Sequence, residues 1–326
     1  MDKYIDLHLH LDGAVTPAIA RGLAAVQGIR LPSDDEKELS RLLTVRPECT
    51  SLNDFLKCFA LPVSLMQTPE GLSEAVRLVC DNIMSQGVIY AELRFAPQLH
   101  TQKGMTQEEA VLAAVSGLKK TRLKANLILC FMRGSDNMDR NYETLEVATK
   151  HIVPDGGAVA VDLAGAEALY PTSDYKALFD EVRRRKLPYT IHAGEADGPQ
   201  SVRSAIEFGT KRIGHGVRSF EDPEVVKMIR EKGIFLEMCP TSNRQTHAIP
   251  DMSKYPLVDF VRSGIRVTVN TDDMGVEGTT LADEFRYLKQ TFGLTEDEAK
   301  ITLRNSVEAA FTTDQVRKDL LKTLGL

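Results

Sequence analysis

The stretch KYIDLHLH at residues 3–10 is a short run of β-type residues that ends in polar side chains. Seven further runs of this kind follow along the chain, and segments with helical patterns separate them. Strict alternation of strand and helix predicts parallel strands joined by right-handed crossovers, and eight repeats predict an α/β fold closed into a (β/α)8 TIM barrel. The expected strands cover residues 3–10, 88–95, 126–132, 157–163, 188–192, 211–215, 233–238 and 265–270.

An open, doubly wound sheet is the alternative to a closed barrel. It is disfavoured because no GxGxxG or GxxxxGK[ST] loop follows any expected strand. Helix boundaries are marked by capping boxes at 106–109 and 295–298, and by a helix that starts at Asp222-Pro223 and ends before Gly233. No low-complexity or Pro/Ser-rich linker divides the 326 residues, so we expect one domain over residues 1–326.

Residues 16–87, between the first two expected strands, are too many for one crossover helix, so we expect extra helices there, above the barrel mouth. Leu52, Phe55, Leu56 and Phe59 fall at i, i+3, i+4 and i+7, which predicts one apolar stripe on a helix. Ordinary core packing explains such a stripe. The alternative is a lid over the apolar face of a flat ligand, in which case these four residues bind substrate.

The composition argues against several classes of partner. A formal net charge of −6 and a sequence pI of about 5.7 provide no broad basic surface for polymeric nucleic acid. Five cysteines without CxxC spacing fit neither a disulfide framework nor a thiolate metal site. No apolar run approaches the roughly 18–20 residues that cross a bilayer, and the first strand begins too early for a secretory signal. We therefore expect a cytoplasmic protein with no membrane partner.

Polar side chains gather at the C-terminal ends of the expected strands, where barrel enzymes place their sites. His8 and His10 are two residues apart on a strand, so both imidazoles point to the same side and can bind one metal. Alone, such a pair is equally compatible with core or surface histidines. His192 and Glu195 follow the fifth strand, and His215 ends the sixth.

The eighth strand is followed by Asp272 and Asp273, whose side chains diverge on an extended backbone, so one can bind a metal while the other has a different role. Imidazole and carboxylate ligands without thiolate suit a catalytic Zn²⁺ or, less specifically, another divalent transition metal with one position open to water. Such a metal lowers the pKa of its water toward ~7. The fourth strand ends without a lysine to bridge two metals, which favours one metal.

Together these motifs resemble the adenosine deaminase family over essentially the whole chain from His8. No motif is specific alone, but their order along the chain is. They are HxHLDG at 8–13, YAELRFAP at 90–97, DLAG at 162–165, HAGE at 192–195, RIGHG at 212–216, CPTSN at 239–243 and NTDD at 270–273.

The resemblance implies hydrolysis of adenosine or 2′-deoxyadenosine to the inosine nucleoside and ammonia. It implies that Glu195 shares a proton with purine N1, that His215 orients the attacking hydroxide, and that Asp273 holds that hydroxide and the leaving amine from the other side. These groups must converge on one carbon from different directions. One zinc per chain is implied, with the ligands His8, His10, His192 and Asp272.

The same resemblance implies that the ligand is a small purine nucleoside. Gly165 would contact the purine through its backbone, Asp12 would bind the ribose 5′-hydroxyl, and His10 would border the substrate as well as the metal. The CPTSN motif is expected to be a structural turn at the mouth. It lacks the second cysteine of the PCxxC motif in deaminases that act on nucleic acids, which excludes that class.

Two positions depart from the family pattern: Ala166 stands where an aspartate is usual, and Met274 where a proline is usual. The alternative substrates are adenine, 6-aminodeoxyfutalosine, or an N6-substituted adenine nucleoside or nucleotide, with Arg244 as a candidate phosphate contact. Adenine deaminases of the superfamily tend to carry an aspartate where Gly214 stands here. Two further alternatives are a single-metal barrel hydrolase of an amide, lactone or phosphoester, and a binding protein without activity.

Overall fold

Two four-stranded parallel sheets, in the orders β1-β2-β3-β4 and β5-β6-β7-β8, form the centre of the molecule. The structure, a computed structural model, describes residues 2–45 and 57–326. The strands are β1 (Tyr4–His10), β2 (Val88–Phe95), β3 (Lys124–Met132), β4 (Ala158–Ala164), β5 (Ile191–Ala193), β6 (Arg212–His215), β7 (Phe235–Met238) and β8 (Arg266–Val269).

The two sheets meet at two parallel seams. Val161 of β4 pairs with Tyr189 before β5, and Leu9 of β1 pairs with Asp272 after β8. The second seam is held by His10 N–H donating to Asp272 O and Asp272 N–H donating to His8 O, each at 2.8 Å. The eight strands therefore close on themselves, which confirms the predicted barrel and makes the open-sheet alternative wrong.

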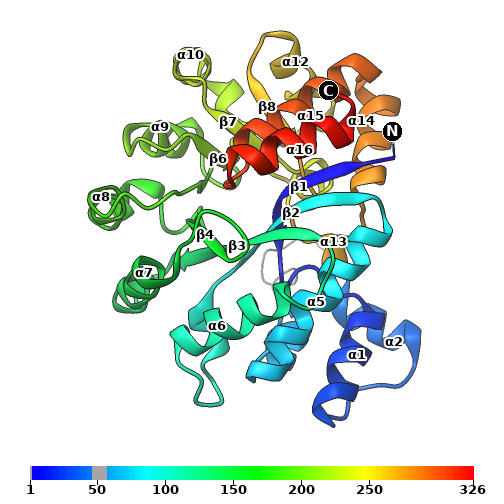
Figure 1. The fold of residues 1–326 in the computed structure, drawn as a ribbon. Helices are drawn as coiled ribbons and strands as arrows, with labels where there is room; N and C mark the ends of the chain where they lie inside the picture. The colour runs from blue at the N-terminus through cyan, green and yellow to red at the C-terminus, as the bar shows by residue number, and fades with distance from the viewer. Residues whose placement is uncertain (1, 46–56) are drawn as a thin grey trace.

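The helices surround this barrel as an outer layer (Figure 1). They are α1 (Pro17–Gln27), α2 (Glu36–Leu43), α4 (Ala60–Leu65), α5 (Pro69–Ser85), α6 (Gln107–Leu118), α7 (Met138–His151), α8 (Lys176–Arg184), α9 (Pro199–Glu207), α10 (Pro223–Lys232), α11 (Pro240–Gln245), α12 (Leu257–Arg262), α13 (Met274–Glu277), α14 (Leu281–Phe292), α15 (Glu296–Ala309) and α16 (Asp314–Leu324). Short 3-10 helices lie at Pro97–His100, Thr172–Tyr175, Val217–Glu221 and Met252–Lys254.

The predicted helix signals form as expected. Thr106 and Thr295 each take part in a complete capping box, at the start of α6 and α15. Asp222 caps α10 by accepting from Glu224 N–H, and Gly233 ends that helix with a left-handed φ of 62°. A glycine suits that conformation because it has no Cβ to clash.

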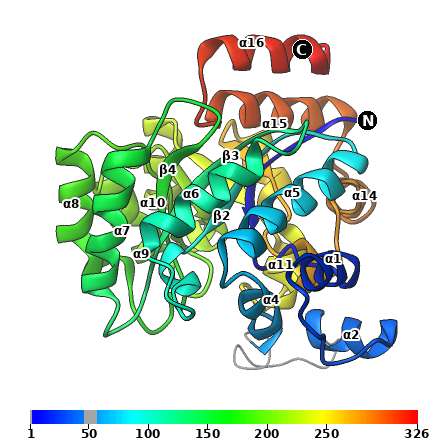
Figure 2. The same ribbon diagram turned by 60° about the horizontal axis from the view of Figure 1, so that its bottom comes forward.

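The described part of the insertion between β1 and β2 contains α1, α2, α4 and α5, so it adds helices as its length predicted. Figure 2 shows α2 and α4 at one end of the barrel and α16 at the other. At the α16 end, Val316 and Leu320 pack in one apolar cluster with Ile5 and Tyr90, so α16 covers the N-terminal ends of the strands. The C-terminal ends therefore open toward α4.

One expected turn is a helix: residues of the CPTSN motif form the start of α11. Pro240 suits the first helical position, and Asn243 N–H donates to Cys239 O at 2.9 Å. Four of the cysteines, Cys58, Cys80, Cys130 and Cys239, are described, and each is buried; Cys80, Cys130 and Cys239 have free thiols, as expected. Among the described residues, no helix combines the length and apolar composition needed to cross a bilayer.

Candidate active site

Three imidazoles and a carboxylate meet at the C-terminal end of the barrel. Nε2 of His192 lies 3.0 Å from Nε2 of His8 and 3.2 Å from Nε2 of His10. Asp272 Oδ1 lies 3.2 Å from His8 Nε2 and 3.4 Å from His10 Nε2. Strand alternation brings His8 and His10 to one side, and closure of the barrel between β1 and the end of β8 brings Asp272 to them. The structure therefore assembles all four predicted metal ligands.

In each histidine ring, the contact made by the nitrogen that faces away from the centre determines whether the inward nitrogen carries a proton. His8 Nδ1 lies 2.8 Å from Glu237 Oε2, an acceptor-only carboxylate, so Nδ1 carries the proton. His192 Nδ1 lies 2.8 Å from Asp162 Oδ2, although the two atoms do not have the geometry of a hydrogen bond. Both Nε2 lone pairs consequently point at a common position. Such convergence of lone pairs suits a cation.

His215 belongs to the same cluster but has the opposite tautomer. Its ligand atom lies within 4.8 Å of those of His8, His192 and Asp272. Asn243 Nδ2 lies 3.0 Å from His215 Nδ1, and Tyr255 donates to Asn243 Oδ1, which assigns the amide nitrogen as the donor to His215. A neutral His215 therefore carries its proton on Nε2. This makes it a hydrogen-bond donor toward the centre rather than a metal ligand.

Glu195 and Asp272 flank His215 on its Nε2 side. Glu195 Oε2 lies 3.5 Å from that nitrogen, and Asp272 Oδ2 lies 3.6 Å from it. Burial raises the pKa of Glu195 above its usual value, although the neighbouring His215 ring opposes this. Burial also opposes ionisation of Asp272, but the neighbouring His8 and His215 rings outweigh it and hold the pKa of Asp272 well below its usual range. The two carboxyl groups are thus pushed toward opposite protonation states.

Asp273 lies beside Asp272 and lines the same cavity, and carboxylate oxygens of the two residues lie within 4.8 Å of each other. The expected divergence on an extended backbone is wrong, because Asp272 has a left-handed φ of 65°. Burial, followed by the charge of Asp272, raises the pKa of Asp273 well above its ordinary value. Its Oδ1 is buried and makes no hydrogen bond. A Cβ placed on Gly13 would lie 1.7 Å from that oxygen, so only glycine fits beside it. A buried carboxyl oxygen with no protein partner is available to a ligand.

A cavity of about 480 Å³ opens onto these groups, a size that suits a small organic ligand. Asp12, Gly165 and Phe59 line it together with His10 and the other inward-facing polar residues. The predicted stripe residues Leu52, Phe55 and Leu56 lie outside the described residues. Much of the remaining wall is apolar: Val63, Ala96, Leu99, Met132, Ala164, Ala166, Ala168, Ala196 and Ala248.

Comparison with known proteins identifies this arrangement. A family model described as "Adenosine deaminase" matches residues 4–325. The chain belongs to the adenosine deaminase family. It is 46% identical to an adenosine deaminase of Haemophilus ducreyi over 323 residues, which are 97% of this chain and 94% of that one. It is 38% identical to an adenosine deaminase of Clostridium perfringens, with coverage of 97% and 96%.

Solved structures of deaminases share the barrel. An adenine deaminase from Arthrobacter aurescens superposes with a TM-score of 0.88 at 27% identity, covering 100% of this chain and 98% of that one. The N6-methyl-AMP deaminase of Arabidopsis thaliana gives a TM-score of 0.83 at 25% identity, covering 99% and 96%. Membership of the adenosine deaminase family makes the chain a hydrolytic deaminase of metal-dependent type.

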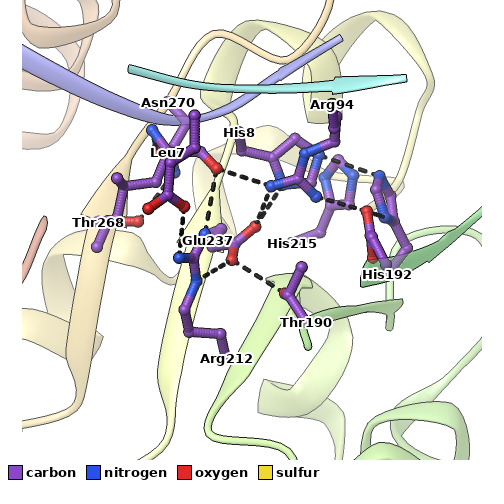
Figure 3. Close-up of polar contacts among 12 residues, drawn as sticks. Leu7, His8, Arg94, Thr190, His192, Arg212, His215, Glu237, Thr268 and Asn270 are labelled. Atoms are coloured by element: carbon purple, nitrogen blue, oxygen red, sulfur yellow. Dashed lines mark hydrogen bonds and ion pairs between the residues drawn. The ribbon is translucent and has the colours of Figure 1, made fainter. Parts of the chain in front are cut away.

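Sequence reasoning missed the charged residues behind the metal ligands in this adenosine deaminase family member. Arg94 lies between His8 and His192 (Figure 3), and its guanidinium contacts Asp162 Oδ2 and Glu237 Oε2, each at 2.7 Å. These two carboxylates are the ones that contact Nδ1 of His192 and His8. Arg94 thus ties together the supports of both histidines. Charged side chains within otherwise apolar expected strands were the available signal.

Two further carboxylates were also missed. Glu167 accepts hydrogen bonds from the backbone of the turn that carries Glu195. Glu277 is buried behind Asp272 and Asp273, and neither of its carboxylate oxygens makes a hydrogen bond. The departures from the family pattern differ in exposure to the cavity: Ala166 lines it, whereas Met274 is buried in the core beside it.

Proposed function

We propose that this protein catalyses the zinc-dependent hydrolytic deamination of adenosine and 2′-deoxyadenosine to inosine and 2′-deoxyinosine with release of ammonia, as one cytoplasmic catalytic domain of 326 residues. One observation carries this proposal. His8, His10, His192 and Asp272 converge at the wall of a cavity in which Glu195 and His215 face them. The curated relatives named adenosine deaminase, up to 46% identical, support the choice of substrate.

The donor set fits one zinc ion per chain. His8, His10 and His192 would bind it through Nε2, and Asp272 would complete the set, with no thiolate present. When bound, the ion would supply a Lewis acid that lowers the pKa of a water molecule toward ~7. The Nε2 atoms of His8 and His10 lie 3.0 and 3.2 Å from that of His192. No other described residue at that point could form hydrogen bonds with all three nitrogens.

The other polar groups act directly on substrate and water. Glu195, whose pKa burial raises, can be protonated when a purine nitrogen is not, so it donates to N1 and makes C6 electrophilic. His215 Nε2–H orients the attacking water from one side. Asp273 accepts from that water and from the leaving amine through its unpartnered oxygen. The three groups approach C6 from different strand ends, which supplies the orientation that the addition needs.

The cavity favours a nucleoside over a nucleotide. Among its described lining residues the only arginine or lysine is Arg218, and this side chain is engaged by Glu221, with Nε to Oε1 at 2.8 Å. Arg244, the candidate phosphate contact, does not line the cavity and lies over the ring of Tyr287 at 5.1 Å. Gly165 would contact the purine and Asp12 the ribose 5′-hydroxyl.

Adenine is the second candidate substrate, because the Arthrobacter aurescens structure is described as an adenine deaminase. The space around Gly214 argues against it. A Cβ at this position would lie 2.9 Å from His8 Cε1 and 3.2 Å from His192 Cα. An aspartate here, as adenine deaminases tend to have, would require the metal-facing histidines to shift. We therefore place adenine second.

A substrate panel tests the proposal. The zinc-loaded protein is assayed with adenosine, 2′-deoxyadenosine, adenine, AMP and N6-methyl-AMP, and both ammonia release and purine absorbance are followed. We expect the two nucleosides to exceed each of the other compounds at least about 100-fold in kcat/KM. A preference for adenine or for either nucleotide would overturn the substrate assignment.

A further inference from the structure

Glu167 occupies an unusual position in the loop after β4. Its side chain is buried, and its carboxylate accepts hydrogen bonds from four consecutive backbone N–H groups. Oε1 accepts from Gly194 at 2.6 Å, and Oε2 accepts from Glu195 at 2.9 Å, Ala196 at 2.8 Å and Asp197 at 3.1 Å. These four residues form the turn after β5, which carries the group that donates to the purine.

Consecutive N–H groups that point inward form a concavity suited to an anion. In this protein the anion is a side chain of the chain itself. Hydrogen bonds to an ionised carboxylate are roughly twice as strong as neutral ones, and four of them fix the path of the turn. Gly194 has a left-handed φ of 73°, and a Cβ there would lie 2.4 Å from Val202. Gly194 is therefore confined to this conformation, and the carboxylate of Glu167 fixes the path of the residues that follow it.

Glu167 itself is held in place and kept ionised. Burial opposes its ionisation, but the charge of Arg133 and the backbone hydrogen bonds outweigh burial, so the pKa of Glu167 lies below its usual value. Arg133 also donates to His192 O at 2.5 Å and to Thr172 Oγ1 at 3.0 Å. The guanidinium that keeps Glu167 ionised is therefore itself hydrogen-bonded to the strand end that supplies a metal ligand.

We infer that Glu167 is a positioning residue, which sets the Glu195 carboxyl group against the substrate by holding residues 194–197. The inference rests on the proposed function, because it assigns Glu195 the contact with the purine. Glu167 lies two residues after Gly165, whose backbone faces the same cavity. The carboxylate of Glu167 therefore fixes the loop that carries Gly165 relative to the turn that carries Glu195. It contacts no reacting atom, because both of its oxygens accept from the turn.

Geometry explains why the turn needs such a hold. Proton donation to N1 requires heavy atoms within about 2.6–3.2 Å, and displacement of a catalytic group by about 1 Å can lower the rate about 100-fold. Glu195 has one other described hydrogen bond at its carboxylate, from Thr246 Oγ1 at 3.2 Å. Its backbone position, set by Glu167, consequently determines where its carboxyl group lies.

The test compares Glu167→Gln with the wild type and with Glu181→Gln, a partly exposed glutamate on α8 outside the cavity lining. A glutamine keeps the shape but offers one acceptor oxygen, and its NH2 group faces N–H donors. With zinc content matched by elemental analysis, we expect kcat for adenosine to fall 10- to 100-fold while KM changes less than 3-fold. We also expect amides 194–197 to exchange hydrogen at least 10-fold faster, with Glu181→Gln unchanged in both respects.

A merely structural Glu167 would lower the melting temperature and leave kcat of the folded, zinc-loaded protein within 2-fold of the wild type, and this result would overturn the inference. If Glu167→Gln does not fold, exchange in the wild type decides. Amides 194–197 should be protected from hydrogen exchange as strongly as those of β6. Unprotected amides would refute the inference that Glu167 holds this turn. A wild type inactive on adenosine would refute the proposed function instead, since exchange is measured without substrate.

Discussion

Each histidine of the site has its role set by a different partner at Nδ1. Glu237 accepts from His8 and Asp162 lies against His192, which leaves their Nε2 lone pairs for a metal, whereas Asn243 donates to His215 and leaves a proton on its Nε2. Identical side chains therefore act as ligand or as donor according to one neighbour. This distinction comes from residues far away in sequence, such as Glu237, which is 229 positions from His8.

Replacing Glu195 should separate metal binding from catalysis. Glu195→Gln keeps the size of the side chain but cannot transfer a proton to N1, so we expect kcat to fall at least about 100-fold. Zinc content and melting temperature should stay near those of the wild type, because Glu195 is not among the proposed ligands. Steady-state assays with elemental analysis check both. Near-normal kcat with zinc bound would contradict the role.

Asp162 should affect the metal without touching it. In Asp162→Asn the charge contact with His192 Nδ1 is lost, and we expect zinc affinity to fall about 10- to 100-fold. Competition with a chromophoric chelator measures this, with Asp180→Asn, an exposed position on α8, as the matched control. Unchanged affinity in Asp162→Asn would show that His192 does not depend on this carboxylate.

Sequence patterns located the inward-facing residues but not their supports. His8, His10, His192, His215, Asp272 and Asp273 all follow from their places at strand ends. Arg94 and Glu237 could not be assigned in the same way, because their contacts form only when β2 and β7 are brought together across the barrel. Backbone acceptors such as Glu167 leave no spacing signal at all.

At the scale of elements, the helices added between β1 and β2 shape the mouth of the barrel. Phe59, which precedes α4, and Val63 within α4 both line the cavity. The apolar stripe predicted for this region therefore touches the site at its one described member. The prediction of a lid remains a prediction, since its other three members lie in residues 46–56.

Phe59 should contribute to binding more than to turnover. We expect Phe59→Ala to raise KM for adenosine about 10-fold or more, because an aromatic side chain on the cavity wall gives apolar contact to a purine. The value of kcat should change less than 3-fold. Leu61→Ala, within α4 but outside the cavity lining, is the control. Equal effects of the two substitutions on KM would argue for general loosening of α4.

Strand positions were predictable to within a few residues, and strand lengths were less so. The expected strand 188–192 is only Ile191–Ala193 in the structure. Pro188 has no N–H to donate, and Tyr189 contributes only an isolated bridge to Val161. Residues 239–243 were expected to form a turn and instead begin a helix, because Pro240 at its first position suits helix initiation as well as a turn.

Across the whole molecule, the interior of the barrel is charged rather than apolar. Arg94 and Arg212 are buried among Glu92, Asp162 and Glu237, with four ion pairs of 2.6 or 2.7 Å. Burying ions costs free energy, and removing one partner typically destabilises a protein by about 3–5 kcal/mol. The composition did not reveal this network, because the charges of its two arginines and three carboxylates nearly cancel. It links the site to the body of the barrel.

Stability should depend on pH through Glu284. Burial raises its pKa from 4.5 to about 7, although hydrogen bonds from Thr241 and Thr279 oppose the shift. The folded state therefore holds this proton longer than the unfolded state, and stability is lost as pH rises from about 4.5 to about 7. The loss is about 3 kcal/mol at most, at 1.36 kcal/mol per pKa unit.

Glu284→Gln should remove this dependence. We expect the variant to gain stability over the wild type at pH 8 and to lose that advantage near pH 4.5. Urea unfolding at several pH values measures it, and Glu308→Gln, which is half-exposed, serves as the control. A difference between Glu284→Gln and wild type that stays constant with pH would contradict the assignment.

The central claim is that one zinc ion, held by His8, His10, His192 and Asp272, is required to deaminate adenosine. The most direct measurement is to remove metal with a chelator, titrate Zn²⁺ back, and follow ammonia release from adenosine together with bound zinc. The account predicts no activity without metal and a linear rise that levels off at one zinc per chain. Activity that persists in metal-free protein, or none on adenosine at full zinc occupancy, would contradict it.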